Sequence, residues 1–236
     1  LSLHKERREW FILKKLWKHN IMAVNDDVVH PEIFNFLNNE NIFTSQDIKK
    51  FNPDLIISFD VAWIEQYWEI YKNNLEIFLN TTNVCIDHHT SNTWIWSVNI
   101  IDIDASSTCE IVYDLIKLLW HQDLIDEKIS SFLLTWIISD TNSFYNSNST
   151  SKASKSAWEL MNYNPRHQEI ILNLFKKKPY HRLKLWWKIL ENLKDLKEWK
   201  IVWNTVPLSL FIQTWTTNND ISWLIDEFLT TIDWLD

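Results

Sequence analysis

Residues 84–92 read VCIDHHTSN, a stretch that joins an apolar run to a cluster of polar side chains. The run at 84–86 has the composition of a buried strand, and Asp87, His88 and His89 follow it directly. Ligands of α/β folds gather at the carboxyl ends of strands, and carboxylate and imidazole groups together suit manganese, iron or zinc. The stretch therefore predicts a metal site at a strand end, although a polar turn with a chance pair of histidines is the simpler alternative.

Strand-like and helix-like segments alternate on both sides of this stretch. Apolar patterns predict strands at 21–24, 54–60, 84–86, 98–103 and 200–203. They predict helices at 5–18, 64–79, 106–119, 126–138, 157–162, 168–177 and 181–196, with a polar loop at 146–154. This alternation predicts an α/β fold, in which a doubly wound, mostly parallel sheet is followed by linker helices and a smaller α/β domain.

Composition limits the partners of the chain. It has 236 residues and a net charge of −8, so a basic track for long nucleic acid is not expected. An acidic enzyme that cleaves phosphate esters would obtain positive charge locally, most simply from metal ions. The chain has only two cysteines, Cys109 and Cys85, and Cys85 lies inside an apolar run. So few cysteines are typical of a reduced, cytoplasmic protein. No apolar run approaches the roughly 18 residues of a membrane span, so no membrane partner is expected.

The chain contains no glycine and 16 tryptophans, whereas average usage would give roughly 16 glycines at this length. Trp17 and Trp120 follow helical segments, where helices usually end on a left-handed residue. Trp94 and Trp96 follow the histidine pair in a loop that small residues would suit. Our hypothesis is that these tryptophans stand at UGA codons that the source organism reads as glycine. A truly tryptophan-rich protein is the alternative, and UGG codons at most of these positions would support it.

Acidic and imidazole side chains occur at the ends of three predicted elements: Asp60, the group Asp87-His88-His89, and Asp140. A two-metal centre needs several carboxylates, one of them bridging, with imidazole completing the ligand set. Each of these residues alone would more often be a cap or turn residue, so the prediction of a metal centre depends on the whole set.

Several motifs resemble those of one enzyme family. Residues 84–96, VCIDHHTSNTWIW, resemble the defining motif of the DHH phosphoesterases, with tryptophan where the family has glycine. Residues 104–112, DASSTCEIV, and 133–144, LLTWIISDTNSF, are similar to later motifs of its nanoRNase and pAp phosphatase branch. Residues 59–62, FDVA, stand where the second motif belongs.

The resemblance implies a role for each matching residue. Asp60 would bridge two Mn²⁺ ions, and His88 and Asp140 would bind one of them. His89 would contact the scissile phosphate, and Asp87 would hold a histidine in one tautomer from outside the metal shell.

The resemblance also implies a domain organisation. Residues 1–155 would form a DHH domain, 156–197 a helical linker, and 198–236 the start of a DHHA1 substrate-binding domain, where Trp199 and Trp223 again replace glycine. The first motif, a His followed by an Asp-x-Asp pair, is absent before the helix at 5–18, and the glycine-rich C-terminal motif is absent too. The arginine often found after Phe144 is replaced by Tyr145. We therefore expect a fragment of a longer protein, inactive by itself if the missing ligands are essential.

The function that the resemblance implies is a manganese-dependent hydrolase, a phosphodiesterase or phosphatase. Its substrates would be short oligoribonucleotides, dinucleotides or 3′-phosphoadenosine 5′-phosphate, and a homodimer is compatible with it. A single-strand-specific exonuclease of the same superfamily is the nearest alternative. A catalytically inactive nucleotide-binding or regulatory module is the alternative from another class. An inorganic pyrophosphatase fits less well, because residues 198–236 resemble DHHA1.

Overall fold

The structure is a computed structural model that describes residues 15, 21, 23, 45–93, 96–196, 200–221 and 224–225. The chain divides into two compact units, Leu1–Leu174 and Phe175–Asp236. The boundary between them falls inside the predicted linker at 156–197. The predicted strand at 21–24 and helix at 5–18 lie almost wholly outside the described residues.

The first unit contains a parallel sheet of three strands, β1 (Leu55–Phe59), β2 (Thr82–Asp87) and β3 (Val98–Ile101), in the order β1-β2-β3. β2 is therefore central, and it pairs with β1 in a register that sets Phe59 beside Ile86. All three strands were predicted from apolar runs. Because they are parallel, their carboxyl ends meet at one edge, where Asp60 follows β1 and Asp87 ends β2.

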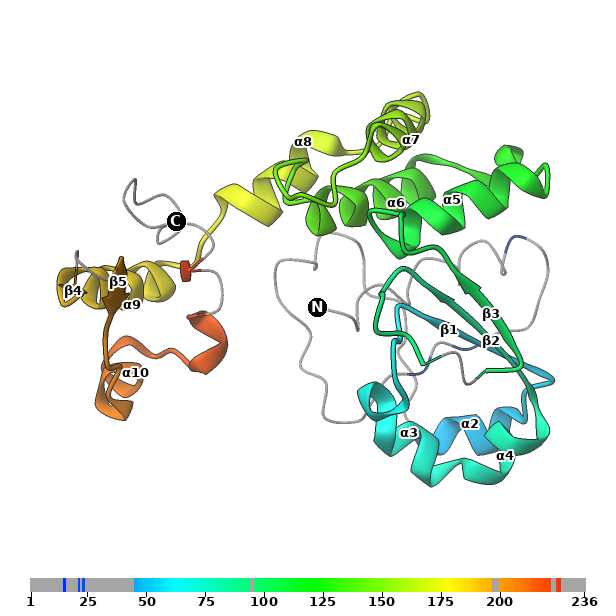
Figure 1. Cartoon of the computed structure of the whole chain (residues 1–236), viewed down its shortest axis with the longest axis horizontal. Helices are drawn as coiled ribbons and strands as arrows, with labels where there is room; N and C mark the ends of the chain where they lie inside the picture. Colours follow the sequence, from blue (N-terminus) through cyan, green and yellow to red (C-terminus); the bar gives the residue numbers. More distant parts are fainter. Residues whose placement is uncertain are drawn as a thin grey trace. The chain divides into compact units, whose positions relative to one another are not determined.

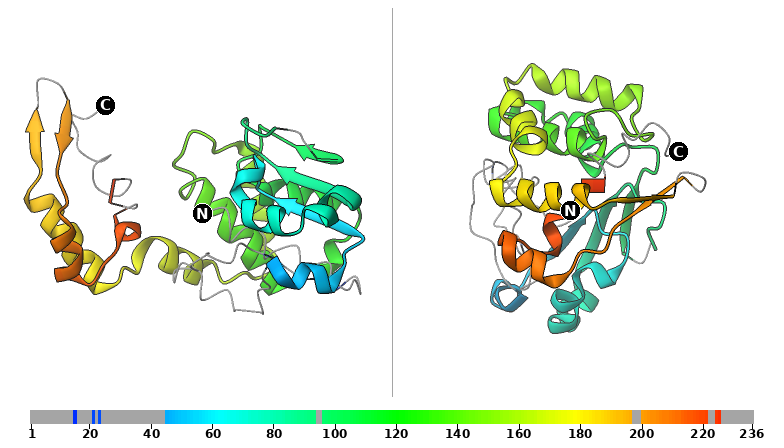
Figure 2. Two further views of the ribbon diagram at one scale, coloured as in Figure 1. Left: turned by 90° about the horizontal axis from the view of Figure 1, so that it is seen from below. Right: turned by 90° about the vertical axis from the view of Figure 1, so that its left-hand side faces the viewer.

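Helices cover both faces of this sheet (Figure 1), which confirms the predicted α/β class. On one side lie α2 (Ser45–Phe51), α3 (Trp68–Asn73) and α4 (Leu75–Asn80). Ile48, Ile70 and Phe78 of these helices form a core with Cys85 of β2. On the other side lie α5 (Thr108–Leu118), which packs against β2, and α6 (Glu127–Asp140) (Figure 2).

Helix α6 is the centre of the helical layer. Every residue of α6 from Ile129 to Ile138 is buried. The helix contacts α5, α7 (Ser151–Met161) and α8 (His167–Ile171), which continues as a π-helical segment, Leu172–Lys176. Because these helices surround α6, they fix the position of Asp140, its last residue.

Several predicted boundaries were wrong, three of them by a turn of helix or more. The helix predicted at 64–79 is divided into a 3₁₀ segment (Ile64–Tyr67), α3 and α4, and it breaks at Asn74, whose buried side-chain amide donates to the Ile70 carbonyl. The loop predicted at 146–154 ends earlier, because Thr150 caps α7 by accepting from the Ala153 amide. The helix predicted at 181–196 ends at Glu191.

The second unit is built on α9 (Tyr180–Glu191), whose last predicted turn is instead strand β4 (Lys194–Leu196). β4 pairs antiparallel with β5 (Ile201–Trp203), and this pairing outweighs the helical pattern at 194–196. Trp186 of α9 and Phe211 of α10 (Leu208–Thr214) are the large side chains of the core here. The assignment of residues 198–236 to a DHHA1 domain stays a prediction. No helix among the described residues is long and apolar enough to cross a membrane.

Two tryptophans occupy backbone positions that favour glycine. Trp120, after α5, has φ 59°, and Trp215, after α10, has φ 58°. At the first, the amides of Trp120 and His121 donate to the carbonyls of Lys117 and Ile116. At the end of α10 the amides of Trp215 and Thr216 donate in the same way to the carbonyls of Ile212 and Phe211. This pair of bonds is the Schellman motif, whose left-handed residue is usually glycine. Both side chains are almost fully exposed, at 86% and 89%, so neither contributes to a core.

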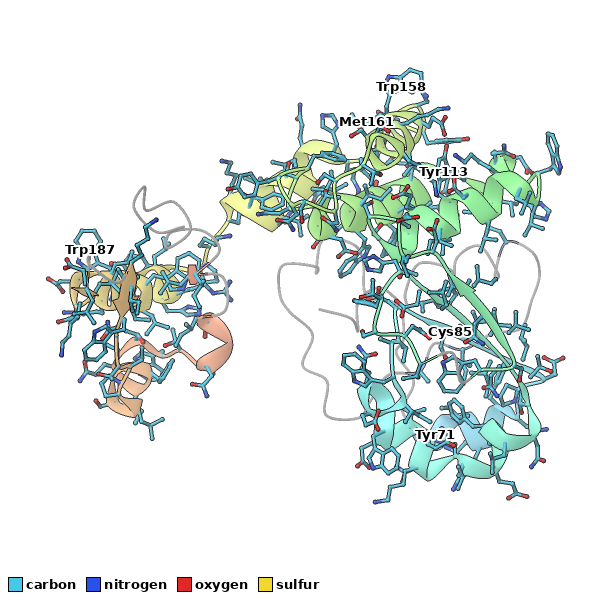
Figure 3. The ribbon with its side chains drawn as sticks, viewed as in Figure 1. Tyr71, Cys85, Tyr113, Trp158, Met161 and Trp187 are labelled. Carbon is cyan, nitrogen blue, oxygen red and sulfur yellow. The ribbon has the colours of Figure 1, made fainter. Side chains whose placement is uncertain are left out.

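Other tryptophans lie in different settings. Trp136 and Trp186 are completely buried, so glycine at either place would leave out a large core side chain. Trp158 and Trp187 are exposed residues of α7 and α9 and point away from their helices (Figure 3). Trp96 is buried, whereas Trp17, Trp94, Trp199 and Trp223 lie outside the described residues. The recoding hypothesis therefore stays a proposal that Trp120 and Trp215 support.

We expect Trp120→Gly and Trp215→Gly each to raise the free energy of unfolding by about 1 kcal/mol, because glycine has no Cβ to oppose a left-handed backbone. Trp187→Gly is the matched control: the residue is exposed but inside a helix, where glycine should lower stability by roughly 0.5–1 kcal/mol. Urea denaturation measures all three variants. Destabilisation by all three would contradict the interpretation of the two left-handed positions, and the codons of the gene test the recoding itself.

Candidate functional site

The site lies at the carboxyl edge of the parallel sheet, where three of its residues meet. Ligand atoms of Asp60, His88 and His89 lie within 4.8 Å of one another. The His88 Nε2 is 3.4 Å from Asp60 Oδ1 and 4.0 Å from Asp140 Oδ2. The structure thus brings together all five side chains that the sequence singled out, with Asp87 completing the group through its bond to His89.

Asp60 reaches this group because the chain turns sharply after β1. Its φ is 61°, a left-handed conformation that costs free energy for a residue other than glycine, although aspartate tolerates it better than most. Its amide donates to the Ile86 carbonyl at 2.9 Å, which continues the pairing of β1 with β2 by one residue. The carboxylate is buried, and Oδ1 accepts a 2.7 Å hydrogen bond from Thr108 Oγ1.

His88 has one defined tautomer. Its Nδ1 lies 3.1 Å from the Ala105 carbonyl, which can only accept, so Nδ1 carries the proton. Nε2 is buried without a hydrogen-bond partner among the described residues, and it is the nitrogen that carries the lone pair whenever the ring is neutral. A buried lone pair that faces carboxylates from Asp60 and Asp140 is the arrangement that a metal ion would satisfy.

Asp87 is saturated by hydrogen bonds from its own neighbourhood. Oδ1 accepts from the amides of His88 and His89, at 2.8 and 3.3 Å, and from His89 Nδ1 at 2.7 Å. Oδ2 accepts from Asn92 Nδ2 at 2.8 Å. Burial favours a raised pKa for Asp87, but the bonds from His89 and Asn92 hold the pKa below its usual value. This carboxylate is therefore ionised and orients His89.

His89 is the most accessible member of the group, with a side chain 40% exposed. Its Nδ1 lies 3.9 Å from Asp60 Oδ1, but that nitrogen already donates to Asp87. This bond fixes the orientation of the imidazole ring. The two histidines thus have different partners: His88 Nδ1 is bonded to the Ala105 carbonyl, and His89 Nδ1 is bonded to the Asp87 carboxylate.

Asp140 is followed by an unusual turn. Asn142, Ser143 and Phe144 all have left-handed backbones, with φ of 46°, 58° and 67°. Such a run is costly for residues with a Cβ, and strained segments of this kind cluster at functional sites. The side-chain amides of Asn146 and Asn148 both donate to the Asp140 carbonyl, at 3.2 Å, and hold the end of α6 against the turn.

Sequence reasoning missed the residues that orient the others. Asn92 was quoted in the motif without a role, yet its amide group joins Asp87 to the Val61 carbonyl. Thr108 lies inside the quoted motif 104–112 without a role of its own, yet its hydroxyl donates to Asp60. No pattern in the sequence signals these contacts, since Thr108 and Asp60 are 48 residues apart.

Comparison with known proteins agrees with this geometry. The family model described as the DHH family, N-terminal domain, matches residues 11–139. Over 99 residues the chain is 32% identical to the bifunctional oligoribonuclease and PAP phosphatase NrnA of Thermus thermophilus, a match that covers 42% of this chain and 30% of that protein. The match thus spans less than a third of the length of this curated relative.

A solved structure supports the fold over the whole chain. The crystal structure of an exopolyphosphatase-related protein from Bacteroides fragilis is similar with a TM-score of 0.88, over 99% of this chain and 69% of that one. The sequences are only 16% identical, so this likeness concerns the fold alone. The family match covers more than half of the chain and includes Asp60, Asp87, His88 and His89. The chain belongs to the DHH family.

Proposed function

We propose that this chain is the catalytic-domain part of a manganese-dependent phosphoesterase that hydrolyses short oligoribonucleotides, dinucleotides or 3′-phosphoadenosine 5′-phosphate. The observation that carries the proposal is the buried lone pair of His88 Nε2, which faces the carboxylates of Asp60 and Asp140. Family membership supports hydrolysis of a phosphoester, and the name of the Thermus relative supports nucleotide substrates.

The donor set fits the proposed metal. The carboxylates of Asp60 and Asp140 and the imidazole of His88 are ligands that manganese accepts, and this set contains no sulfur ligand, which would favour zinc. Asp60 would be the central ligand, since its buried carboxylate lies 3.4 Å from His88 Nε2, and His88 and Asp140 would complete the ligand set. When bound, the cations would neutralise phosphate oxygens and make a bound water acidic.

The residues beside the metal would position the substrate phosphate. Asp87 keeps the proton of His89 on Nδ1, so Nε2 is the ring atom that meets the phosphate or the leaving oxygen. His89 is accessible enough for this contact, with 40% of its side chain exposed. In its protonated form His89 would donate from Nε2 to a phosphate oxygen, and the Asp87 carboxylate would stabilise the resulting charge.

The acidic composition favours short substrates. With a net charge of −8, the chain offers little distributed positive charge to follow a long phosphate backbone. Binding would then depend on the metal centre and on contacts to one or two nucleotides. A preference for short substrates favours the phosphoesterase over the single-strand exonuclease of the same superfamily.

The test uses the protein expressed from its complete reading frame. We expect release of AMP from a 5′-phosphorylated diadenylate, or of phosphate from 3′-phosphoadenosine 5′-phosphate, with Mn²⁺ and not with EDTA. A long single-stranded RNA should be cleaved much more slowly. Fast, processive cleavage of the long RNA would instead support the exonuclease. Nucleotide binding without any hydrolysis would contradict the proposal in favour of a binding module.

A further inference from the structure

The short turn that leads into α5 contacts two of the proposed metal ligands. Its Ala105 carbonyl accepts the Nδ1 proton of His88, and the Thr108 hydroxyl donates to Asp60. These ligands belong to different strands, since Asp60 follows β1 and His88 follows β2. Every residue of the turn, from Ala105 to Thr108, is buried. One rigid segment therefore sets the orientation of both ligands.

Hydrogen bonds within the segment hold it in place without the Thr108 hydroxyl. Ser107 is the N-cap of α5, and its hydroxyl accepts from the Glu110 amide at 3.3 Å. Glu110 Oε2 in turn accepts from the amide and hydroxyl of Ser106, at 2.9 and 2.7 Å. The start of α5 is thus capped by other groups, and the hydroxyl proton of Thr108 is committed to Asp60.

The third proposed ligand is tied to the same segment through its backbone. Asn148 Nδ2 lies 3.1 Å from the Ser106 carbonyl and 3.2 Å from the Asp140 carbonyl, and it donates to both. The turn before α5 is therefore connected to Asp60, His88 and Asp140, which come from three separate parts of the chain.

We propose that Thr108 is a positioning residue for Asp60: its hydroxyl fixes the rotation of this carboxylate so that the remaining lone pairs face the metal. The inference rests on the proposed function. Asp60 needs such a partner because it follows the end of β1 in a left-handed conformation. A hydroxyl suits the task because it is neutral: it orients the carboxylate without bringing a cation that would compete with metal. Thr108 is also the first residue of α5, an 11-residue helix, and the positive electrostatic potential at the helix N-terminus favours the same carboxylate.

Thr108→Val tests this role, since valine keeps the shape and removes only the hydroxyl. We expect Mn²⁺ affinity, measured by electron paramagnetic resonance of the protein from its complete reading frame, to fall roughly 10- to 100-fold. Thr108→Ser should restore the affinity to within about threefold, because it keeps the donor. Thr135→Val is the matched control: Thr135 is equally buried, and its hydroxyl donates to the Ser131 carbonyl inside α6. This control should change stability alone.

The outcomes separate the two proposals. Equal Mn²⁺ affinity in the unmodified protein and Thr108→Val would overturn the role of Thr108 and leave the proposed function standing. The same loss in Thr108→Ser as in Thr108→Val would also overturn it, since the hydroxyl would then be irrelevant. Absence of Mn²⁺ binding by the unmodified protein would overturn the proposed function and this role with it.

Discussion

Asp60→Asn is expected to abolish metal-dependent hydrolysis, with a loss of roughly a thousandfold or more. The substitution preserves shape but removes the charge of the carboxylate that would bridge the ions. Metal-based stabilisation of a transition state supplies several kcal/mol, and about 4 kcal/mol corresponds to a thousandfold. Steady-state hydrolysis of a diadenylate with Mn²⁺ measures the effect.

The same variant should separate metal binding from folding. A ligand that binds only the folded state stabilises it by mass action, so we expect Mn²⁺ to raise the Tm of the unmodified protein but not of Asp60→Asn. Asp104→Asn is the matched control, because Asp104 is an exposed aspartate of the turn near α5. It should keep both the activity and the Mn²⁺-dependent shift. If Asp60→Asn kept the shift, the carboxylate could not be a ligand.

Asp87→Asn is expected to reduce both stability and activity. The carboxylate accepts hydrogen bonds on both oxygens, from His89 on Oδ1 and from Asn92 on Oδ2. The side-chain amide of asparagine would place its N–H₂ group against one of these donors, where no hydrogen bond can form. Loss of hydrogen bonds to a buried charge should lower the free energy of unfolding by about 2–3 kcal/mol. His89 would lose its fixed tautomer, which should reduce kcat roughly 10- to 100-fold while Mn²⁺ affinity changes less.

The pH dependence of this variant has a definite sign. The pKa of Asp87 is lowered in the folded state because its hydrogen bonds from His89 and Asn92 outweigh burial. Its contribution to stability is therefore present at neutral pH and lost as the pH falls through that lowered pKa. The difference in unfolding free energy between the unmodified protein and Asp87→Asn should be largest near neutrality and shrink in acid. A difference that is constant with pH would contradict the assignment of an ionised Asp87.

Local patterns were enough to predict much of the fold. The strands β1, β2 and β3 were found because each is a short apolar run between turn residues, and α5 and α6 because their apolar positions recur with a helical period. The end of α5 at a left-handed Trp120 was also predicted, since a helix end has a local signature. Elements that depend on distant partners were missed. Strand β4 was predicted as helix, because its pairing with β5 is not encoded in its own residues.

The side chains that gather at the edge of the sheet could be predicted from the sequence. Asp60, Asp87 and Asp140 end or follow elements with clear apolar patterns, and parallel strands bring such ends to one edge. The contacts of each side chain became visible only in the folded structure. Asp87 binds His89, His88 turns Nε2 inward, and Thr108 donates to Asp60. These contacts depend on side-chain rotation or on hydrogen bonds between residues far apart in the chain. Periodicity specifies the face on which a residue lies, whereas directional bonds form only after the chain has packed.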